Sequence, residues 1–497
     1  MEAPPSVPRA EAGQENESDE TLARLPSAML AALKPYQRGA VLHAARHRRV
    51  MVADEPGMGK TLQALAVAEG MRARHVLVLC PLNAAPVWAA EAARWTPHRA
   101  CVRLENPRKR RAVPEPLALP GTTSVCVATY DSAVRPEQAL FHQLRGAEWD
   151  LVVADECHLL QDPATARSAA LATDAASVLQ RAPAVVLLSG TPQRGRPREL
   201  WVQLRVLYPD FMDFNTYCAR FCGGKPDDSR GSSNEAELAA LLGARCLARS
   251  KAGLGLPPKR RVLTRLSAPA AALEEVRRAR AAYAQASWRF AAAGNGPGRA
   301  AALQALKAAK NAYWLASNRA KSRPEFAPLV RARAAAPGKI IFFAHQEVVR
   351  EWLVAVLRGA GHAPAHLHGG TSAAERARMV AELADPAHET RIGVFSIRAC
   401  GVAATCSPGV TRVVFWELMW TPGDHDQAED RVHRLNTTAP VEVEYLCLQE
   451  STDPEVVAAH AAKRSSVAAV VVRSASGGGG AAVTNGPFFG EQRRVTV

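Results

Sequence analysis

Three short stretches of this 497-residue chain contain side chains suited to phosphate chemistry. DEPGMGKT places Lys60 beside glycines, and QAEDRVHRLN contains Arg431 and Arg434 three positions apart. DECH supplies the adjacent carboxylates Asp155 and Glu156. Two neighbouring guanidiniums repel each other unless an anion lies between them or in front of them. Cations in two distant stretches and a carboxylate pair in a third predict chemistry on a phosphate group held with a divalent metal ion.

The stretch RVMVADEPGMGKT has the pattern of a strand, a turn and the start of a helix. Gly57 and Gly59 let the backbone wrap closely around a phosphate, toward which the amides of a helix N-terminus point. Lys60 offers a cation to the β and γ phosphates, and the Thr61 hydroxyl can bind Mg²⁺. The strict pattern has glycine where this chain has Asp54, so we predict a variant of the loop. The alternative is a glycine-rich turn that arose by chance.

The apolar run DLVVADE delivers Asp155 and Glu156 at the end of a predicted strand. Adjacent carboxylates there are costly to bury unless they hold a cation. We predict that Asp155 binds Mg²⁺ through water and that Glu156 orients and deprotonates the attacking water. The alternative is an acidic turn that faces solvent; the phosphate loop upstream favours the catalytic interpretation.

Three further polar residues lie next to predicted strands. Ser189 and Thr191 in AVVLLSGTP could sense the γ phosphate and couple it to nucleic acid, or could cap a helix. Gln37 in LKPYQRGAV comes shortly before the first strand, and its amide could bind the adenine edge. The alternative for Gln37 is an ordinary surface position.

The hydrophobic pattern indicates two α/β units. Apolar runs typical of buried strands occur at 49–54, 75–81, 124–129, 150–156 and 184–190, and again at 339–345, 391–397, 412–418 and 441–448. Alanine-rich helical stretches lie between several of these runs. Val/Leu strands that alternate with helices predict mainly parallel sheets covered by helices on both faces.

The positive charge is concentrated in the middle of the chain. The formal net charge is +15, and residues 259–339 contain seventeen Lys or Arg against three Glu, a net +14. Two helical patterns joined by GNGPG predict an exposed basic hairpin, which favours binding to a polyanion over a merely solvated helix face. The predicted nucleic-acid contacts are Arg277, Arg278, Arg280, Lys307 and Lys310.

The composition excludes several classes of protein. At 48% hydrophobic and 22% charged residues, the chain is typical of globular proteins, and no apolar run is long enough for a membrane span. The ten scattered cysteines lack zinc spacing and predict reduced, mostly buried thiols. PRKRR at 107–111 is similar to a nuclear import signal, or is a basic surface loop.

In order and spacing the motifs resemble the Swi/Snf group of helicase-like ATPases in helicase superfamily two. They are LKPYQRGAV, DEPGMGKT, LVLCPLNAAPVW, DECH, SGTP, KIIFFAH, HGGTSAAER and QAEDRVHR. ELWVQLRVLYPDF, GSSNEAEL, FSIRACGVAATCS and VVFWELMWTPGDHDQAEDRVHRLN are similar to the SMARCA-like, HARP-type branch of annealing helicases. The resemblance covers about residues 30–460.

The resemblance implies two RecA-like lobes around one ATP with Mg²⁺, DNA-stimulated hydrolysis, and movement on DNA that rewinds strands or remodels forks. The expected organisation is a disordered leader (1–25), an ATP-binding lobe (26–267), a basic helical protrusion (268–337), a second lobe (338–465) and a flexible tail (466–497). The expected partner is duplex, forked or junction DNA, bound by a monomer in the nucleus. Two alternatives stay open: a nucleosome-remodelling ATPase, and a DNA-binding scaffold with negligible turnover.

The resemblance also implies an anion for Arg431 and Arg434. We place the pair on one face of a helix, because residues three apart share a face. If the lobes close face to face, both guanidiniums point at the γ phosphate and act as arginine fingers in cis. The alternative is a surface helix whose arginines pair with Glu429 and Asp430. The implied ATP-binding positions are Gln37, Asp54, Gly57, Met58, Gly59, Lys60, Thr61 and Gln427.

Some positions depart from the pattern of the family. Asn436 and Thr437 replace a Gly-Gln pair, and we expect Asn436 to keep the turn by adopting a left-handed backbone. Ala403 stands where the family has glycine, and Ala248 replaces one of two arginines, with Arg249 kept. We expect an active ATPase in which these changes weaken coupling to DNA.

Overall fold

The computed structural model describes residues 20–104, 123–223, 231–251, 254–294, 296–397, 405–467, 470–471 and 488–497. Residues 1–19 of the expected leader (1–25), the stretch PRKRR and Ala403 lie outside the described residues. The disorder expected for 20–25 is wrong, because residues 20–23 are helical and Thr21 and Leu25 are buried. By its internal contacts the chain divides into lobe 1, residues 1–250 with 466–482, and lobe 2, residues 251–465 with 483–497. None of the described helices is long and apolar enough to cross a membrane.

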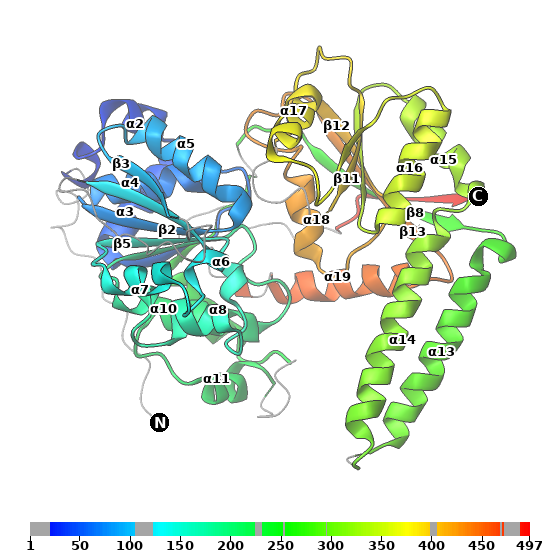
Figure 1. Cartoon of the computed structure of the whole chain (residues 1–497), viewed down its shortest axis with the longest axis horizontal. Helices are drawn as coiled ribbons and strands as arrows, with labels where there is room; N and C mark the ends of the chain where they lie inside the picture. Colours follow the sequence, from blue (N-terminus) through cyan, green and yellow to red (C-terminus); the bar gives the residue numbers. More distant parts are fainter. Residues whose placement is uncertain are drawn as a thin grey trace. The chain divides into compact units, whose positions relative to one another are not determined.

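Lobe 1 contains a seven-stranded parallel sheet in the order β3-β4-β2-β5-β6-β1-β7 (Figure 1). The strands are β1 Arg49–Val52, β2 His75–Cys80, β3 Ala100–Leu104, β4 Ser124–Thr129, β5 Leu151–Asp155, β6 Val185–Leu188 and β7 Cys246–Leu247. The helices are α2 Ser27–Ala32, α3 Pro35–His47, α4 Lys60–Gly70, α5 Ala85–Trp95, α6 Tyr130–Ala133, α7 Ala139–Gly146, α8 Ala166–Ser168, α9 Val178–Arg181, α10 Trp201–Leu207, α11 Phe214–Phe221 and α12 Glu235–Gly243. The covered parallel sheet that the sequence predicted is confirmed.

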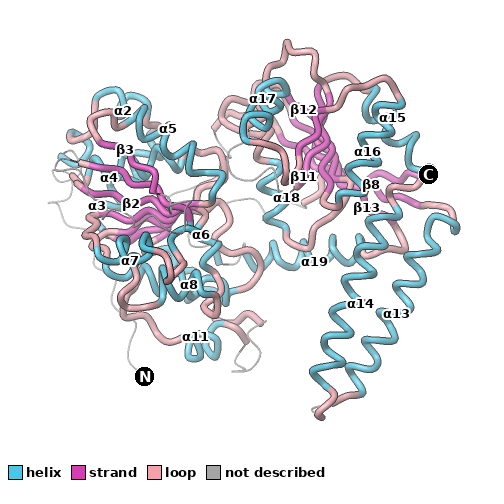
Figure 2. The backbone as a smooth tube through the Cα atoms, in the orientation of Figure 1, coloured by secondary structure: helices cyan, strands magenta, loops and turns pink. Residues whose placement is uncertain are grey.

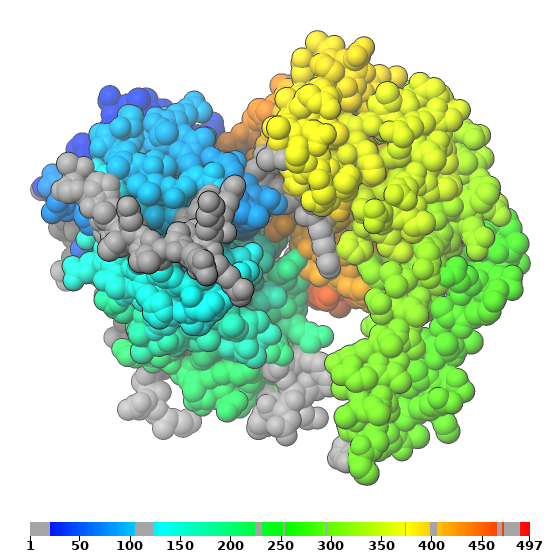
Figure 3. Space-filling model, in the orientation of Figure 1, coloured from blue at the N-terminus to red at the C-terminus, as the bar shows by residue number. Residues whose placement is uncertain are grey.

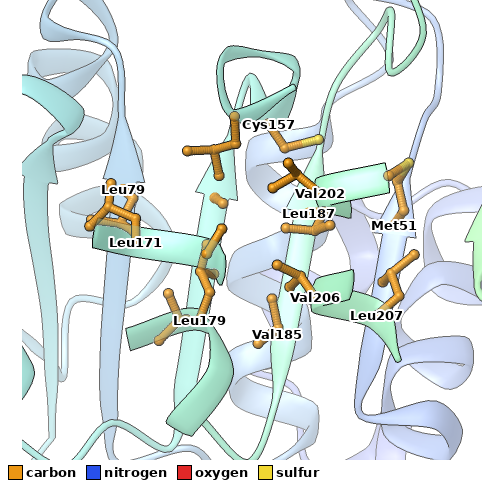
Figure 4. Close-up of a cluster of buried hydrophobic side chains, with 14 of the residues drawn as sticks. Met51, Leu79, Cys157, Leu171, Leu179, Val185, Leu187, Val202, Val206 and Leu207 are labelled. Atoms are coloured by element: carbon orange, nitrogen blue, oxygen red, sulfur yellow. The ribbon is translucent and has the colours of Figure 1, made fainter. Parts of the chain in front are cut away.

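Helix α10 shows why the strands of lobe 1 are apolar along their whole length. Val202 and Val206 of α10 are fully buried beside Leu187 of β6 and Met51 of β1 (Figure 4). In Figure 1, α5 lies on one face of the sheet and α7 and α10 lie on the other. Because helices cover both faces, nearly all residues of β1, β2, β4, β5 and β6 are buried, whereas the edge strand β3 has only Leu104 buried. Burying one such apolar side chain contributes about 1.5–3 kcal/mol.

Lobe 2 contains a second seven-stranded parallel sheet, in the order β10-β11-β9-β12-β13-β8-β14. The strands are β8 Lys259–Ser267, β9 Lys339–Ala344, β10 Ala365–Leu367, β11 Ile392–Ser396, β12 Val410–Phe415, β13 Val441–Leu448 and β14 Glu491–Thr496. The helices are α13 Glu274–Ala292, α14 Arg299–Ala320, α15 Ala327–Ala335, α16 Glu347–Gly359, α17 Ala373–Ala384, α18 Pro422–Glu429 and α19 Asp453–Val467.

Two expected boundaries are wrong because of long-range strand pairing. Strand β8 was expected in the first lobe, but it pairs with β13 from Lys259 to Leu266 and so belongs to lobe 2. A flexible tail was expected over 466–497, but β14 pairs with β8 and extends the same sheet. Val470 and Val471 are also buried, in the hydrophobic core of lobe 1. Neither the pairing of β8 with β13 nor that of β14 with β8 has a local sequence signal, because each joins segments that are distant in the chain.

The basic helices α13 and α14 run side by side and extend from lobe 2 as a hairpin (Figure 2). In the space-filling view the hairpin, in green, stands out from the rest of its lobe (Figure 3). The rings of Tyr283 and Tyr313 stack between the helices with centroids 6.1 Å apart. The hairpin belongs to the contact unit of lobe 2 and is not a separate domain.

Candidate nucleotide site and nucleic-acid interface

The phosphate loop lies between β1 and α4. Gly57 and Gly59 have φ of 85° and 75°, in the left-handed region that favours glycine. A Cβ atom at Gly59 would lie 2.4 Å from Gln37 Nε2, so a larger residue there would have to displace the Gln37 side chain and adopt a strained backbone. The first turn of the 11-residue helix α4 follows directly, with its free amides at the loop. The backbone thus has the form required to wrap a phosphate.

Lys60 and Thr61 begin α4 beside this loop. The Lys60 ammonium donates to the backbone carbonyl of Asp54 at 2.7 Å and lies 3.4 Å from that of Glu55. These are neutral oxygens, so the positive charge of Lys60 has no carboxylate partner there. Thr61 is partly exposed. Both side chains are therefore available at the edge of the loop for anionic oxygens or a metal ion.

Asp54 has a structural role in the loop, and its expected contact with ATP stays a prediction. Its fully buried carboxylate receives a bidentate pair of hydrogen bonds from Arg249, each 2.7 Å long. Gln63 donates to the same carboxylate at 3.0 Å. All of these contacts hold the base of the loop against α4 and the segment after β7. The sequence does not indicate this pairing, because Arg249 is 195 positions away from Asp54.

Replacing Arg249 with alanine is expected to destabilise lobe 1 by about 3–5 kcal/mol, because the change leaves a buried carboxylate unpaired. The quantity to measure is the free energy of unfolding of the full chain in urea. The double variant Asp54→Asn with Arg249→Ala should recover part of the loss, since the amide is neutral. If the double variant is as unstable as Arg249→Ala, the ion pair is not the cause.

Gln37 and Met58 lie together at the loop. The Gln37 amide nitrogen donates to the Met58 carbonyl at 3.0 Å, and its oxygen accepts the Lys34 amide at 2.9 Å. The Tyr36 hydroxyl donates to the same Met58 carbonyl at 3.0 Å. Gln37 is thereby fixed and buried next to Gly59. The placement is consistent with a nucleotide contact, but both ends of the amide already have a partner within the chain.

The acidic pair stands at the end of β5. Asp155 accepts the Trp88 indole N–H at 2.8 Å and the Glu156 amide at 3.0 Å. Glu156 has φ of 51°, which is unusual for a non-glycine residue. Burial and the charge of Glu156 raise the pKa of Asp155 to about 6, against a lowering by Trp88 and Lys60. Burial and repulsion between the two neighbouring carboxylates thus destabilise the charged form of Asp155, as expected. A bound divalent cation would reduce this destabilisation.

The raised pKa of Asp155 gives a testable pH dependence. Between pH 3.8 and about 6 the folded chain binds a proton that the unfolded chain releases, so the free energy of unfolding falls as pH rises. Asp155→Asn should therefore be more stable than the wild type at pH 8 by about 2 kcal/mol after solvent screening. Urea unfolding at pH 4.5 and pH 8 checks this. The difference should shrink at low pH and with added Mg²⁺; a constant difference would contradict it.

His158 connects the acidic pair to the predicted coupling residues. Its Nδ1 lies 3.0 Å from Ser189 Oγ and 3.2 Å from Glu156 Oε2. Ser189 Oγ in turn accepts the Thr191 amide at 3.1 Å. Ser189 and His158 are buried. Sequence reasoning selected Glu156, Ser189 and Thr191 but missed His158, although it belongs to the DECH tetrad two positions after the glutamate.

Arg431 and Arg434 lie in turns after α18 has ended at Glu429, so the expected helical placement is wrong. Arg431 is 7% exposed, and within the described residues its Nε has no hydrogen-bond partner. Arg434 Nε donates to the backbone carbonyl of Asp430 at 2.9 Å. Burial and the charge of Arg431 lower the pKa of Arg434 to about 10. The two cations repel each other, as the sequence predicted. We call residues 430–436 the arginine turn.

The carboxylates next to the arginine turn are occupied by other cations. Glu429 pairs with Arg261 at 2.7 Å and Lys259 at 2.8 Å, and accepts the Tyr445 hydroxyl at 2.6 Å. Burial would raise the pKa of Glu429, but Arg261 and Lys259 lower it well below its ordinary value.

Asp430 is occupied in the same way, by Lys251 at 2.7 Å and Lys259 at 3.6 Å. The local ion-pair alternative for Arg431 and Arg434 is therefore wrong. No local sequence pattern indicates that Lys251, Lys259 and Arg261 neutralise the acids beside the turn, because these cations are distant in the chain.

The C-terminal segment packs against this charge network. The Phe488 ring lies 4.4 Å from the Arg261 guanidinium and 3.8 Å from that of Arg464. Phe489 packs against Tyr445, with ring centroids 5.3 Å apart. Phe488 thus covers Arg261, one of the two cations that hold Glu429.

Phe488→Ala is expected to destabilise lobe 2 by about 2 kcal/mol, through lost packing and lost cation–π contacts. Thermal and urea unfolding of the full chain measure the effect. Arg494→Ala is the matched control, because Arg494 is exposed on β14 of the same segment. Equal destabilisation by both variants would assign the effect to the strand alone and contradict the role of the ring.

Asn436 and Thr437 hold the arginine turn by side-chain hydrogen bonds. Asn436 Nδ2 donates to the Ser407 carbonyl at 2.9 Å, and Thr437 Oγ1 accepts the Arg434 amide at 2.8 Å. The left-handed backbone expected for Asn436 is wrong, because it is absent from the described non-glycine residues with positive φ. Gln427, on α18, is partly exposed near the turn.

The five predicted nucleic-acid residues are all exposed on α13 and α14. Arg277 pairs with Glu450 at 2.9 Å and Arg278 with Glu274 at 2.7 Å. The Lys310 ammonium lies 4.4 Å from the Trp420 ring centroid. For Arg280 and Lys307 no ion pair exists among the described residues. These last two have the most freely available charges of the five.

Two families of known proteins match this chain in succession. The SNF2-related domain matches residues 36–274, and the helicase conserved C-terminal domain matches residues 326–436. Together they cover more than two thirds of the chain.

Among the residues described, no group of three or more His, Cys, Asp or Glu could hold a metal ion by itself.

Curated relatives match most of the chain. The human DNA annealing helicase and endonuclease ZRANB3 is 29% identical over 453 residues, which are 88% of this chain and 40% of that protein. The Xenopus laevis SWI/SNF-related matrix-associated actin-dependent regulator of chromatin subfamily A-like protein 1 is 29% identical over 88% of this chain and 44% of that protein. The chain thus spans less than half the length of either relative.

A solved structure is also similar over most of the chain. The Sulfolobus solfataricus SWI2/SNF2 ATPase core in complex with dsDNA aligns with 89% of this chain and 94% of that chain, at 19% identity and a TM-score of 0.42.

The order of motifs and the two domain matches lead to one assignment. This chain belongs to the SNF2-related, helicase-like family, with an SNF2-related domain followed by a helicase C-terminal domain.

Proposed function

We propose that the protein is a DNA-dependent ATPase that moves on duplex or branched DNA and rewinds or remodels it. The main support is the buried Arg431 and the half-buried Arg434 beside it, since the adjacent carboxylates Glu429 and Asp430 are paired with other cations. Buried arginines without an acidic partner are costly unless an anion binds them during function. A γ phosphate is the anion that suits the rest of the chain.

In lobe 1, ATP would bind at the loop before α4. The helix amides and Lys60 would hold the β and γ phosphates. Thr61 and Asp155 would bind Mg²⁺, and the fit is supported by their hard oxygen donors and by the raised pKa of Asp155. When bound, Mg²⁺ neutralises phosphate charge and helps to orient the γ phosphate. Glu156 would accept the proton of the attacking water.

In lobe 2, the arginine turn would complete the reaction. Arg431 and Arg434 would stabilise the charge that spreads over the γ phosphate in the transition state, with Gln427 near the nucleotide. Hydrolysis would then require the lobes to close on one ATP. DNA bound to both lobes would favour closure, and Ser189 and Thr191, linked through His158 to Glu156, would transmit the state of the nucleotide.

The DNA partner is supported by the basic hairpin and by the relatives, which are named as a DNA annealing helicase and a chromatin regulator. Arg280 and Lys307 are the preferred contacts, with Arg277, Arg278 and Lys310 around them. We further propose a monomer that acts in the nucleus.

A substrate panel tests the proposal. ATPase activity is measured as phosphate release with no DNA, single-stranded DNA, duplex, fork and nucleosome. We expect strong stimulation by duplex or forked DNA and no additional stimulation by nucleosomes. Preferential nucleosome sliding would favour the chromatin alternative. A rate that no DNA increases, in a chain that still binds DNA, would favour the scaffold alternative.

A further inference from the structure

A shallow pocket with a volume of about 410 Å³ lies on the helical hairpin beside α19. Arg280, Tyr283 and Trp288 of α13 line it, together with Tyr313 of α14 and Glu455 of α19. All of these elements belong to lobe 2. The proposed ATP site uses none of these residues, so the pocket requires a separate explanation.

Trp288 is the most unusual residue of this pocket. It is 71% exposed, the largest fraction among the exposed large hydrophobic residues that the structure describes. A tryptophan in water leaves a large apolar ring without a partner, which is typical of a binding surface. Tyr283 and Tyr313, whose rings are already stacked at 6.1 Å, form the adjacent wall. The pocket thus offers one open aromatic face beside a rigid aromatic pair.

The charges around the pocket indicate what kind of ring it would hold. Arg280 is exposed and, unlike Arg277 and Arg278, forms no ion pair within the described part of the chain. Its guanidinium is therefore available for a phosphate. Glu455, which also lines the pocket, repels a phosphate but accepts hydrogen bonds from exocyclic amino groups. A planar base with its phosphate directed toward Arg280 satisfies both charges.

We propose that this pocket binds an unpaired nucleobase of single-stranded DNA by stacking it on Trp288. The proposal rests on the proposed DNA-dependent function and adds the class of DNA that the hairpin recognises. In an intact duplex the faces of the bases are stacked on each other, so only a gap, a fork or a displaced strand can offer one. Stacking on aromatic side chains is tolerant of sequence, so any base should suffice. The hairpin would then bind the unpaired strand beside the duplex.

The test measures the binding of fluorescent oligonucleotides by anisotropy. The probes are a single-stranded 20-mer, the matching duplex, and a single strand with abasic sites in place of bases. Trp288→Ala should weaken single-strand binding about tenfold, because stacking contributes about 1–3 kcal/mol per base. Duplex binding should be unchanged. Trp288→Phe should retain most of the affinity for the single strand.

Two controls separate stacking from other causes. Val348, on α16 of the same lobe, is 50% exposed, and Val348→Ala should bind every probe as the wild type does. The abasic strand keeps its phosphates, so it should bind Trp288→Ala and the wild type equally. Equal loss of single-strand and duplex binding in Trp288→Ala, with a lower Tm, would assign the residue a structural role and overturn the proposal. Unchanged single-strand binding would also overturn it and favour docking of a protein.

The outcome is distinguishable from failure of the proposed function. If duplex or fork stimulates the wild-type ATPase and Trp288→Ala still binds the single strand normally, only this inference fails. If no DNA stimulates ATP hydrolysis, the proposed function fails, whatever Trp288 does in the binding assay.

Discussion

Replacing Arg431 with alanine is expected to lower the kcat of ATP hydrolysis by about 10³-fold, the lower end of what arginine fingers contribute in other phosphoryl-transfer enzymes. Its guanidinium would neutralise charge that develops only in the transition state, so the affinity for ATP should change little. Phosphate release at saturating ATP and DNA gives kcat, and a fluorescent ATP analogue gives the affinity for nucleotide.

Stability provides an independent readout for Arg431. Its Nε has no partner among the described residues, and its charge lowers the pKa of Arg434, so Arg431→Ala should fold at least as stably as the wild type. Lys251→Ala is the matched contrast, because Lys251 is a buried cation bonded to Asp430 at 2.7 Å. That variant should lose about 3 kcal/mol of stability.

The same comparison defines what would contradict the role of Arg431. If Arg431→Ala hydrolyses ATP at the wild-type rate, the pair does not act on the phosphate. If it is inactive but also unfolds as readily as Lys251→Ala, the arginine is structural. Arg431→Lys should recover only a small part of the activity, because an ammonium lacks the planar fork of a guanidinium.

The second large effect is expected for Glu156→Gln. The amide has the shape of the carboxylate but cannot accept a proton, so kcat should fall by about 10²–10⁴-fold. Lys60 and the loop are unchanged, so ATP should still bind. The variant should therefore remain in the ATP-bound form on DNA, with slower release of DNA than the wild type. Single-turnover hydrolysis and the rate of DNA dissociation measure the two effects.

Lys60→Ala is the comparison for Glu156→Gln. It removes the cation at the loop and should weaken the binding of ATP itself, whereas Glu156→Gln should not. A Glu156→Gln variant with the kinetics of Lys60→Ala would mean that the glutamate serves binding rather than proton transfer.

His158→Ala should lower the stimulation of ATP hydrolysis by DNA more than it lowers the rate of ATP hydrolysis without DNA. The reason is that it breaks the link between Glu156 and Ser189.

Local patterns in the sequence were sufficient for the fold class and for the location of the candidate site. The apolar runs predicted most strands, because residues that are buried on both faces must be apolar along the whole strand. The glycines at 57 and 59 predicted the loop, because their backbone requires positive φ. The spacing of Arg431 and Arg434 predicted that their charges repel each other. Side chains three positions apart lie close together in a helix, and these two also do so in the turns after α18.

By itself, then, the sequence determined the two covered parallel sheets, the order of the motifs and which side chains could handle phosphate. Only the tertiary structure decided how the buried charges are paired. Arg249 meets Asp54 across 195 positions, Arg261 and Lys259 neutralise Glu429, and β14 returns to β8. The physical reason is that periodicity and backbone preference act over a few residues. The partner of a buried charge, by contrast, is whichever distant strand becomes its neighbour once the sheet is assembled.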